Sequence, residues 1–71
     1  MMNNYCNVIE MDGDCLLGND LHFERPDAIK QFKKVIKKIN PKATAQRMKT
    51  AIEEGWFGKG KKNVYLSSPE L

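Results

Sequence analysis

The stretch from Pro26 to Asn40, PDAIKQFKKVIKKIN, has the strongest periodic pattern in this 71-residue chain. At 100° per residue, one arc of about 120° holds its larger apolar side chains, namely Ile29, Phe32, Val35, Ile36 and Ile39. An adjoining arc of about 140° holds Lys30, Lys33, Lys34, Lys37 and Lys38. Pro26 and Asp27 are typical of a first helical turn, where backbone N–H groups lack partners and the helix dipole is positive. The stretch therefore predicts a helix with one face for a core and one face for an anionic partner.

A second helix is predicted from Pro41 to Glu54. Asn40-Pro41 combines an N-cap residue with a proline at the first helical position, and Gly55 is typical of a left-handed C-terminal cap. One narrow side of this helix carries small or apolar residues, namely Thr44, Ala45, Met48, Ala51 and Ile52. We expect that side to pack on the first helix.

Residues 5–23 predict a three-stranded antiparallel meander with two-residue turns at Asp12-Gly13 and Gly18-Asn19. In that register one face, which we assign to the core, holds Ile9, Met11, Leu16, Leu21 and Phe23. The other face holds Cys6, Glu10, Cys15, Asp20 and His22, with Val8 and Leu17 as apolar exceptions. Cys6 and Cys15 lie too far apart along the strands for a disulfide, so we expect two free thiols, as in a reducing compartment.

After Trp56-Phe57 and the basic loop GKGKK, residues 63–68 alternate like a short strand. The fold class is therefore α+β: a three-stranded antiparallel meander, two packed helices and a short C-terminal β-hairpin or edge strand. Residues 1–71 are expected to form a single small domain with frayed ends at 1–4 and 68–71. The predicted core is thin, as is common in chains that need a dimer or a partner for stability. It comprises Ile9, Met11, Leu16, Leu21, Phe23, Ile29, Phe32, Val35, Ile36, Ile39, Met48, Ile52 and Val64.

Charge is distributed unevenly along the chain. Residues 1–27 hold one arginine against six carboxylates, a net charge of −5, whereas residues 28–71 hold eleven Lys and Arg against three carboxylates, a net charge of +8. The first twenty residues contain four carboxylates and no long apolar run, so no signal peptide or membrane span is expected. We expect a cytoplasmic protein with no membrane partner.

Nucleic-acid binding is the leading functional hypothesis, because clustered lysines neutralise phosphates and release counterions without reading bases. The expected phosphate contacts are Lys33, Lys34, Lys37, Lys38, Lys42, Arg47, Lys49, Lys59, Lys61 and Lys62. The order helix, helix, basic hairpin is similar to that of a winged helix-turn-helix, as an architectural analogy, and suggests a small regulator. A solvated lysine face on a soluble helix is the simpler alternative.

The second hypothesis is a protein-interaction or inhibitor module that docks on a partner through an acidic sheet face or an aromatic hairpin. Its expected contact residues are Glu10, Asp20, Val8, Leu17, Trp56 and Tyr65. Trp56 and Phe57 could stack on bases or close a small core, and Tyr65 is the more exposed aromatic by its strand position.

Catalysis, cofactor binding and metal binding are not expected. The loop Gly58-Lys59-Gly60-Lys61 lacks the spacing of a phosphate-binding loop, and the aspartates near Gly13 do not follow a calcium-loop pattern. Cys6, Cys15 and His22 offer at most three soft ligands, one short of a structural zinc site. No nucleophile, base and orienting group can be assembled from the pattern, so we expect no small-molecule substrate.

Overall fold

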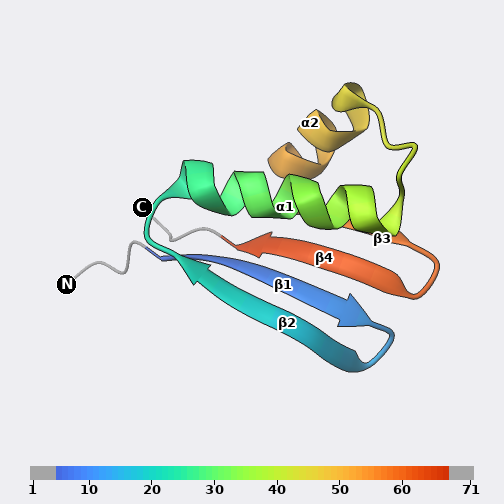
Figure 1. The fold of residues 1–71 in the computed structure, drawn as a ribbon, viewed down its shortest axis with the longest axis horizontal. Coiled ribbons are helices and arrows are strands. Elements are labelled where there is room, and N and C mark those ends of the chain that lie inside the picture. The colour runs from blue at the N-terminus through green and yellow to red at the C-terminus, as the bar shows by residue number, and fades with distance from the viewer. Residues whose placement is uncertain (1–4, 68–71) are drawn as a thin grey trace.

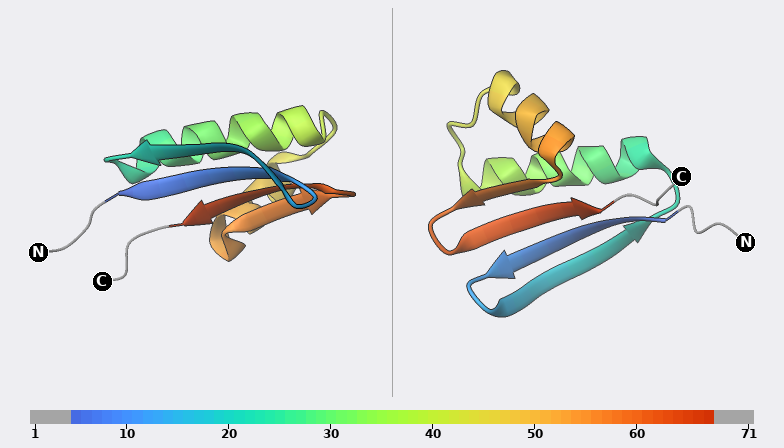
Figure 2. Two further views of the ribbon diagram at one scale, coloured as in Figure 1. Left: turned by 90° about the horizontal axis from the view of Figure 1, so that it is seen from below. Right: turned by 180° about the vertical axis from the view of Figure 1, so that it is seen from behind.

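The computed structural model describes residues 5–67, which form an α+β fold. Four antiparallel strands make one sheet in the order β2-β1-β4-β3, with bounds β1 (Cys6–Asp12), β2 (Cys15–His22), β3 (Trp56–Lys59) and β4 (Lys62–Ser67). Helix α1 (Arg25–Ile39) lies over one face of this sheet, and α2 (Ala45–Glu54) lies beside α1 next to β3 (Figures 1 and 2). The predicted class is confirmed, and the predicted fraying of 1–4 and 68–71 lies outside the described residues.

The predicted turn at Gly18-Asn19 is wrong, because β2 runs through both residues as one strand. Gly18 pairs with Glu10 and Asn19 with Ile9, and the single irregularity between β1 and β2 falls where Leu17 is inserted before the Met11–Leu16 pair. Gly18 does not adopt the positive φ that its predicted place in the turn requires, whereas Gly13, at φ 61°, confirms the first turn. Residues 15–22 therefore pair with β1 as one long strand instead of folding into two short ones.

The strand faces are the reverse of those predicted. Cys6 and Val8 on β1 are buried, at 2% and 1% exposure, and belong to the core cluster beneath α1. Five predicted core residues instead belong to the opposite side, where Ile9 and Met11 are half-buried and Leu16, Leu21 and Phe23 are exposed. Both faces of β1 and β2 are partly apolar, so alternation alone does not distinguish them; the apolar arc of α1 covers the face that carries Val8.

The helices follow the prediction more closely. In α1 the buried residues are Ala28, Phe32, Val35 and Ile36, and Pro26 lies in the first turn as expected. Helix α2 begins at Ala45 instead of Pro41, because Thr44 is its N-cap and its side-chain oxygen accepts a 3.2 Å hydrogen bond from the backbone N–H of Arg47. Gly55, at φ 84°, ends α2 in the predicted left-handed conformation.

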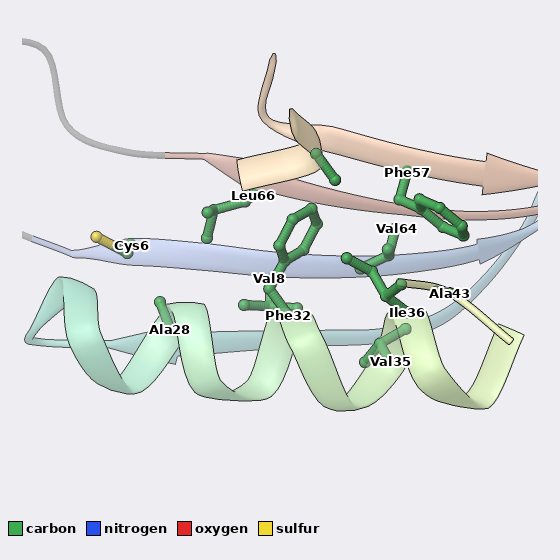
Figure 3. Packing of buried hydrophobic residues seen from close by; sticks show 11 residues of the cluster. Cys6, Val8, Ala28, Phe32, Val35, Ile36, Ala43, Phe57, Val64 and Leu66 are labelled. Atoms are coloured by element: carbon green, nitrogen blue, oxygen red, sulfur yellow. The ribbon is translucent and has the colours of Figure 1, made fainter. Parts of the chain in front are cut away.

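Strands β3 and β4 form the predicted C-terminal hairpin, but this hairpin is part of the main sheet. β4 pairs along its length with β1, so the wing of the helix-turn-helix analogy is absent from residues 5–67. Phe57, Val64 and Leu66 from this hairpin pack against Phe32 and Ile36 of α1 (Figure 3). The predicted core residues Ile29, Ile39, Met48 and Ile52 are half-buried against this cluster.

Both cysteines are free thiols, as predicted, with Cys6 buried and Cys15 exposed. Within residues 5–67, neither helix is long and apolar enough to cross a membrane.

Candidate nucleic-acid interface

A lysine ridge, defined as Lys30, Lys33, Lys34, Lys37 and Lys38, follows the outer side of α1. All five side chains are exposed, because the opposite side of α1 is occupied by the buried apolar arc. Lys30, Lys34 and Lys37 recur at i, i+4 and i+7, a spacing that spans roughly 10 Å along a helix axis. The structure therefore forms the linear basic surface that the periodicity of the sequence predicts.

Among the described residues, only one lysine of this ridge has its charge compensated by a nearby carboxylate. Lys38 is paired, with its Nζ 2.8 Å from Oε2 of Glu10. Among the described residues, no other lysine of the ridge has a carboxylate oxygen within ion-pair distance. Lys30, Lys33 and Lys34 thus present their charge to solvent.

Two segments distant in sequence meet around Asn40: the C-terminal end of α1 with the loop that follows it, and the β3–β4 hairpin. The side-chain oxygen of Asn40 accepts hydrogen bonds from the backbone N–H of Lys42 at 3.3 Å and from Lys59 Nζ at 3.5 Å. Lys37 donates to the carbonyl oxygens of Pro41 and Ala43, at 3.4 Å and 3.0 Å. Figure 1 shows the end of α1 and the β3–β4 turn at the same end of the molecule. Lys42 and Lys59 therefore extend the ridge beyond the helix.

The tip of the β3–β4 hairpin is less basic than its sequence indicates. The backbone N–H of Gly13 donates to the carbonyl oxygen of Lys61 at 2.8 Å, which brings the acidic β1–β2 turn against the hairpin. Lys62 lies opposite Asp12 in the β1–β4 ladder. Carboxylates near Lys61 and Lys62 reduce the local positive potential there.

Basic residues of α2 are partly used for packing. The guanidinium carbon of Arg47 lies 5.5 Å from the ring centre of Phe57, within cation–π range. Lys49 and Lys33 both line a groove of about 240 Å³ between the helices, together with Ala45, Met48, Ile52 and Glu53. Arg47 therefore contributes to the structure as well as to the positive charge of this side.

The expected acidic docking face is not assembled. Val8 is in the core, and the Glu10 side chain, 14% exposed, is held between the sheet and α1 by Lys38. Asp20 accepts a hydrogen bond from the side-chain amide of Gln31, whose oxygen is bonded to His22. Leu17 remains exposed on the edge strand. The outer face assigned to these residues is in fact the face beneath α1, since the strand alternation was assigned to the wrong sides.

Trp56 and Tyr65 are exposed, at 48% and 42%, and lie opposite each other on β3 and β4. Phe57 points the other way, into the core. The Trp56 ring lies over Gly58, where an added Cβ would be 3.1 Å from a ring carbon. Strand alternation through Trp56-Phe57 is the signal that separates the exposed aromatic from the buried one.

Lys30 was not among the expected phosphate contacts, although it belongs to the ridge. Its position four residues before Lys34 is the signal for it. Within residues 5–67, no three His, Cys, Asp or Glu side chains lie close enough together to hold a metal ion. Comparisons with protein families, with curated proteins and with solved structures find no match to this chain.

Proposed function

We propose that this chain is a small, non-enzymatic nucleic-acid-binding protein that contacts phosphates through the lysine ridge of α1, extended by Lys42 and Lys59. The observation that supports this function is the ridge itself, which has five exposed lysines and, in the described part of the chain, only one ion-paired amine. Lysines used only for solubility are commonly interspersed with acidic residues, whereas this ridge has none between Lys30 and Lys38.

Binding of this kind is driven by counterion release. Each phosphate contact adds about 0.9 to the slope of log K against log salt for duplex DNA. Four to five contacts along the ridge would weaken binding by on the order of 10²-fold between 50 and 200 mM salt. No side chain of the ridge is suited to bidentate base recognition, since lysine acts as a point charge, so little sequence preference is expected.

The test is a salt-titrated fluorescence anisotropy measurement with short labelled duplex DNA, duplex RNA and the corresponding single strands. Binding at low salt that weakens steeply as salt rises supports the proposal. Absence of binding to all four probes at low salt overturns it.

Two paired variants with the same change in net charge locate the contact surface. Lys30→Gln/Lys34→Gln removes two unpaired charges from the ridge, and Lys61→Gln/Lys62→Gln removes two from the hairpin tip. The ridge pair should lower the salt slope by about 2, and the tip pair should lower it less because carboxylates already surround the tip. Equal losses in both variants would mean that net charge, and not the ridge, determines binding. Circular dichroism of both variants checks that the fold is unchanged.

Docking of a partner through an acidic sheet face finds no geometric support. Val8, Glu10 and Asp20, which would form that face, lie on the side of the sheet that α1 covers. The face of the sheet that points away from α1 has a different chemistry.

A further inference from the structure

The face of the sheet that points away from α1, here called the open face, carries no charged residue. Its members follow from the strand registers and from the burial of the alternate residues Val8, Phe57 and Val64. They are Asn7, Ile9, Met11, Leu16, Asn19, Leu21, Trp56, Gly58, Asn63, Tyr65 and Ser67. Helix α1 lies over the opposite face, and α2 borders the open face at β3, where Thr50 and Glu54 line a pocket together with Trp56 and Gly58. Every Lys, Arg, Asp and Glu within these strands lies on the helix side or at a turn.

Six of the eleven residues of the open face are aliphatic, Met or aromatic. Leu16 and Leu21 on β2 are 60% and 62% exposed, and Trp56 and Tyr65 on β3 and β4, across β1 in the same sheet, are 48% and 42% exposed. Tyr5 and Phe23 flank the face, with their ring centres 4.9 Å apart. Exposed aromatic, aliphatic and Met side chains on a face without charges are the composition of interface cores.

We propose that the open face binds the open face of a second copy of this chain, giving a two-fold symmetric sandwich with the helices on the outside. In a two-fold symmetric dimer the same surface patch of both copies meets at the interface. A patch that carries charges of one sign would therefore repel its copy. The open face is uncharged, whereas the chain as a whole has a net charge of +3 and the α1 side is lined with lysines. Among the faces of the described fold, the open face is therefore the one suited to self-association.

The two halves of the open face differ in composition. β3 and β4 contribute the aromatic half, with Trp56 and Tyr65, and β1 and β2 contribute the aliphatic half, with Ile9, Met11, Leu16 and Leu21. A two-fold axis parallel to the strands, between β1 and β4, places β3 of one copy over β2 of the other. The aromatic half then packs on the partner's aliphatic half instead of on itself.

The area is sufficient for a weak but specific dimer. Four strands about 4.8 Å apart and six residues of about 3.3 Å each give a flat footprint of roughly 400 Å² per copy. Side chains that stand above the sheet raise the total accessible surface buried by two copies to on the order of 1,000 Å², at the lower limit of specific interfaces. A dissociation constant of micromolar order is expected.

The experiment is a measurement of molar mass by light scattering after size exclusion, over concentrations from about 1 to 200 µM. Nuclease treatment and about 0.3 M salt keep nucleic acid from bridging copies. The expected mass is 8.1 kDa at the lowest concentration and approaches twice that value at the highest. A mass of one chain throughout overturns the proposal.

Variants then identify the interface. Leu21→Lys and Tyr65→Lys should each raise the dissociation constant at least roughly 100-fold, because each buries an unpaired charge. Leu21→Met should leave it nearly unchanged, and Gln46→Lys, which adds the same charge on an exposed position of α2, should do the same. A dimer that survives both open-face lysines overturns the assignment of the face.

This inference and the proposed function fail independently. A monomeric Leu21→Lys protein that still binds nucleic acid through the ridge leaves the proposed function intact. A wild-type dimer that binds no nucleic acid removes the function and leaves the dimer. If both hold, the dimer carries one lysine ridge on each outer side and can hold two phosphate backbones.

Discussion

Glu10 on β1 and Lys38 on α1 form an ion pair across the interface between sheet and helix, with Oε2 and Nζ 2.8 Å apart. The Glu10 side chain is 14% exposed, whereas that of Lys38 is 65% exposed. Lys38 thus places its charge beside a carboxylate that would otherwise be largely buried without a cation. The pair explains how an acidic residue occupies the inner face of β1 next to Val8.

Replacing Lys38 by methionine should destabilise the fold by roughly 1–2 kcal/mol, because the stem is kept while the Glu10 carboxylate loses its cation. Urea denaturation gives the change in the free energy of unfolding. Lys34→Met is the control, since Lys34 lies on the same ridge without an ion-pair partner among residues 5–67, and should cost little. In the Glu10→Gln background, Lys38→Met should cost less than about 0.5 kcal/mol. Equal effects of Lys38→Met and Lys34→Met would contradict the role of the pair.

Val8→Thr and Leu17→Thr separate the two apolar residues that the sequence pattern places on one outer face. Val8 is 1% exposed, so a buried hydroxyl there should cost about 1–3 kcal/mol. Leu17 is exposed at the irregularity in β2, and its replacement should change stability by no more than about 0.5 kcal/mol. Thermal or urea unfolding of both variants measures the two losses of stability. A larger loss for Leu17→Thr than for Val8→Thr would contradict the assignment of the strand faces.

Thr44→Ala should cost about 1 kcal/mol, because it removes the side-chain acceptor of the Arg47 N–H at the start of α2. Thr44→Ser keeps the acceptor and should retain wild-type stability. The quantity to compare is the unfolding free energy at matched protein concentration. An alanine variant as stable as the serine variant would mean that the cap at Thr44 is not significant.

The two thiols should differ sharply in reactivity. Cys15 is exposed on the edge strand and should react with a thiol reagent at the rate of a free cysteine. Cys6 is buried and becomes accessible only through opening of the fold, so its rate should be lower by at least roughly 100-fold. Cys15→Ser isolates the slow phase, and addition of urea should remove the difference. Two equally fast thiols in the folded protein would be incompatible with the position of Cys6 beneath α1.

Local patterns predict several elements correctly. The 3.6-residue periodicity from Ile29 to Ile39 identifies α1 and its lysine ridge, because both depend only on the geometry of one helix. Gly13 and Gly55 identify a turn and a helix end, because their positive φ values are disfavoured for other residues. The candidate site is therefore predicted in part: the ridge is local, whereas the approach of Lys59 to Asn40 joins segments far apart in the sequence.

The predictions from sequence are wrong where a segment is compatible with two local structures. Gly18-Asn19 is compatible with a turn and with a continuous strand, and pairing with β1 decides for the strand because it satisfies the backbone hydrogen bonds of residues 15–22 together. Asn40 and Thr44 are both acceptable N-caps, and the bonds from Lys37 and Lys42 hold residues 40–43 in a loop, which leaves Thr44 as the cap.

Residue order alone determines the helices, the first turn, the hairpin and the separation of lysines from apolar residues on α1, because each depends on neighbours within a few positions. Tertiary structure decides that β4 enters the sheet beside β1, where Asn7 pairs with Ser67, and that Val8 rather than Ile9 faces the helix. Hydrophobic burial is not directional, so a strand that is apolar on both faces acquires an inside only when α1 covers one of them. The face left uncovered is the uncharged one that carries Trp56 and Tyr65.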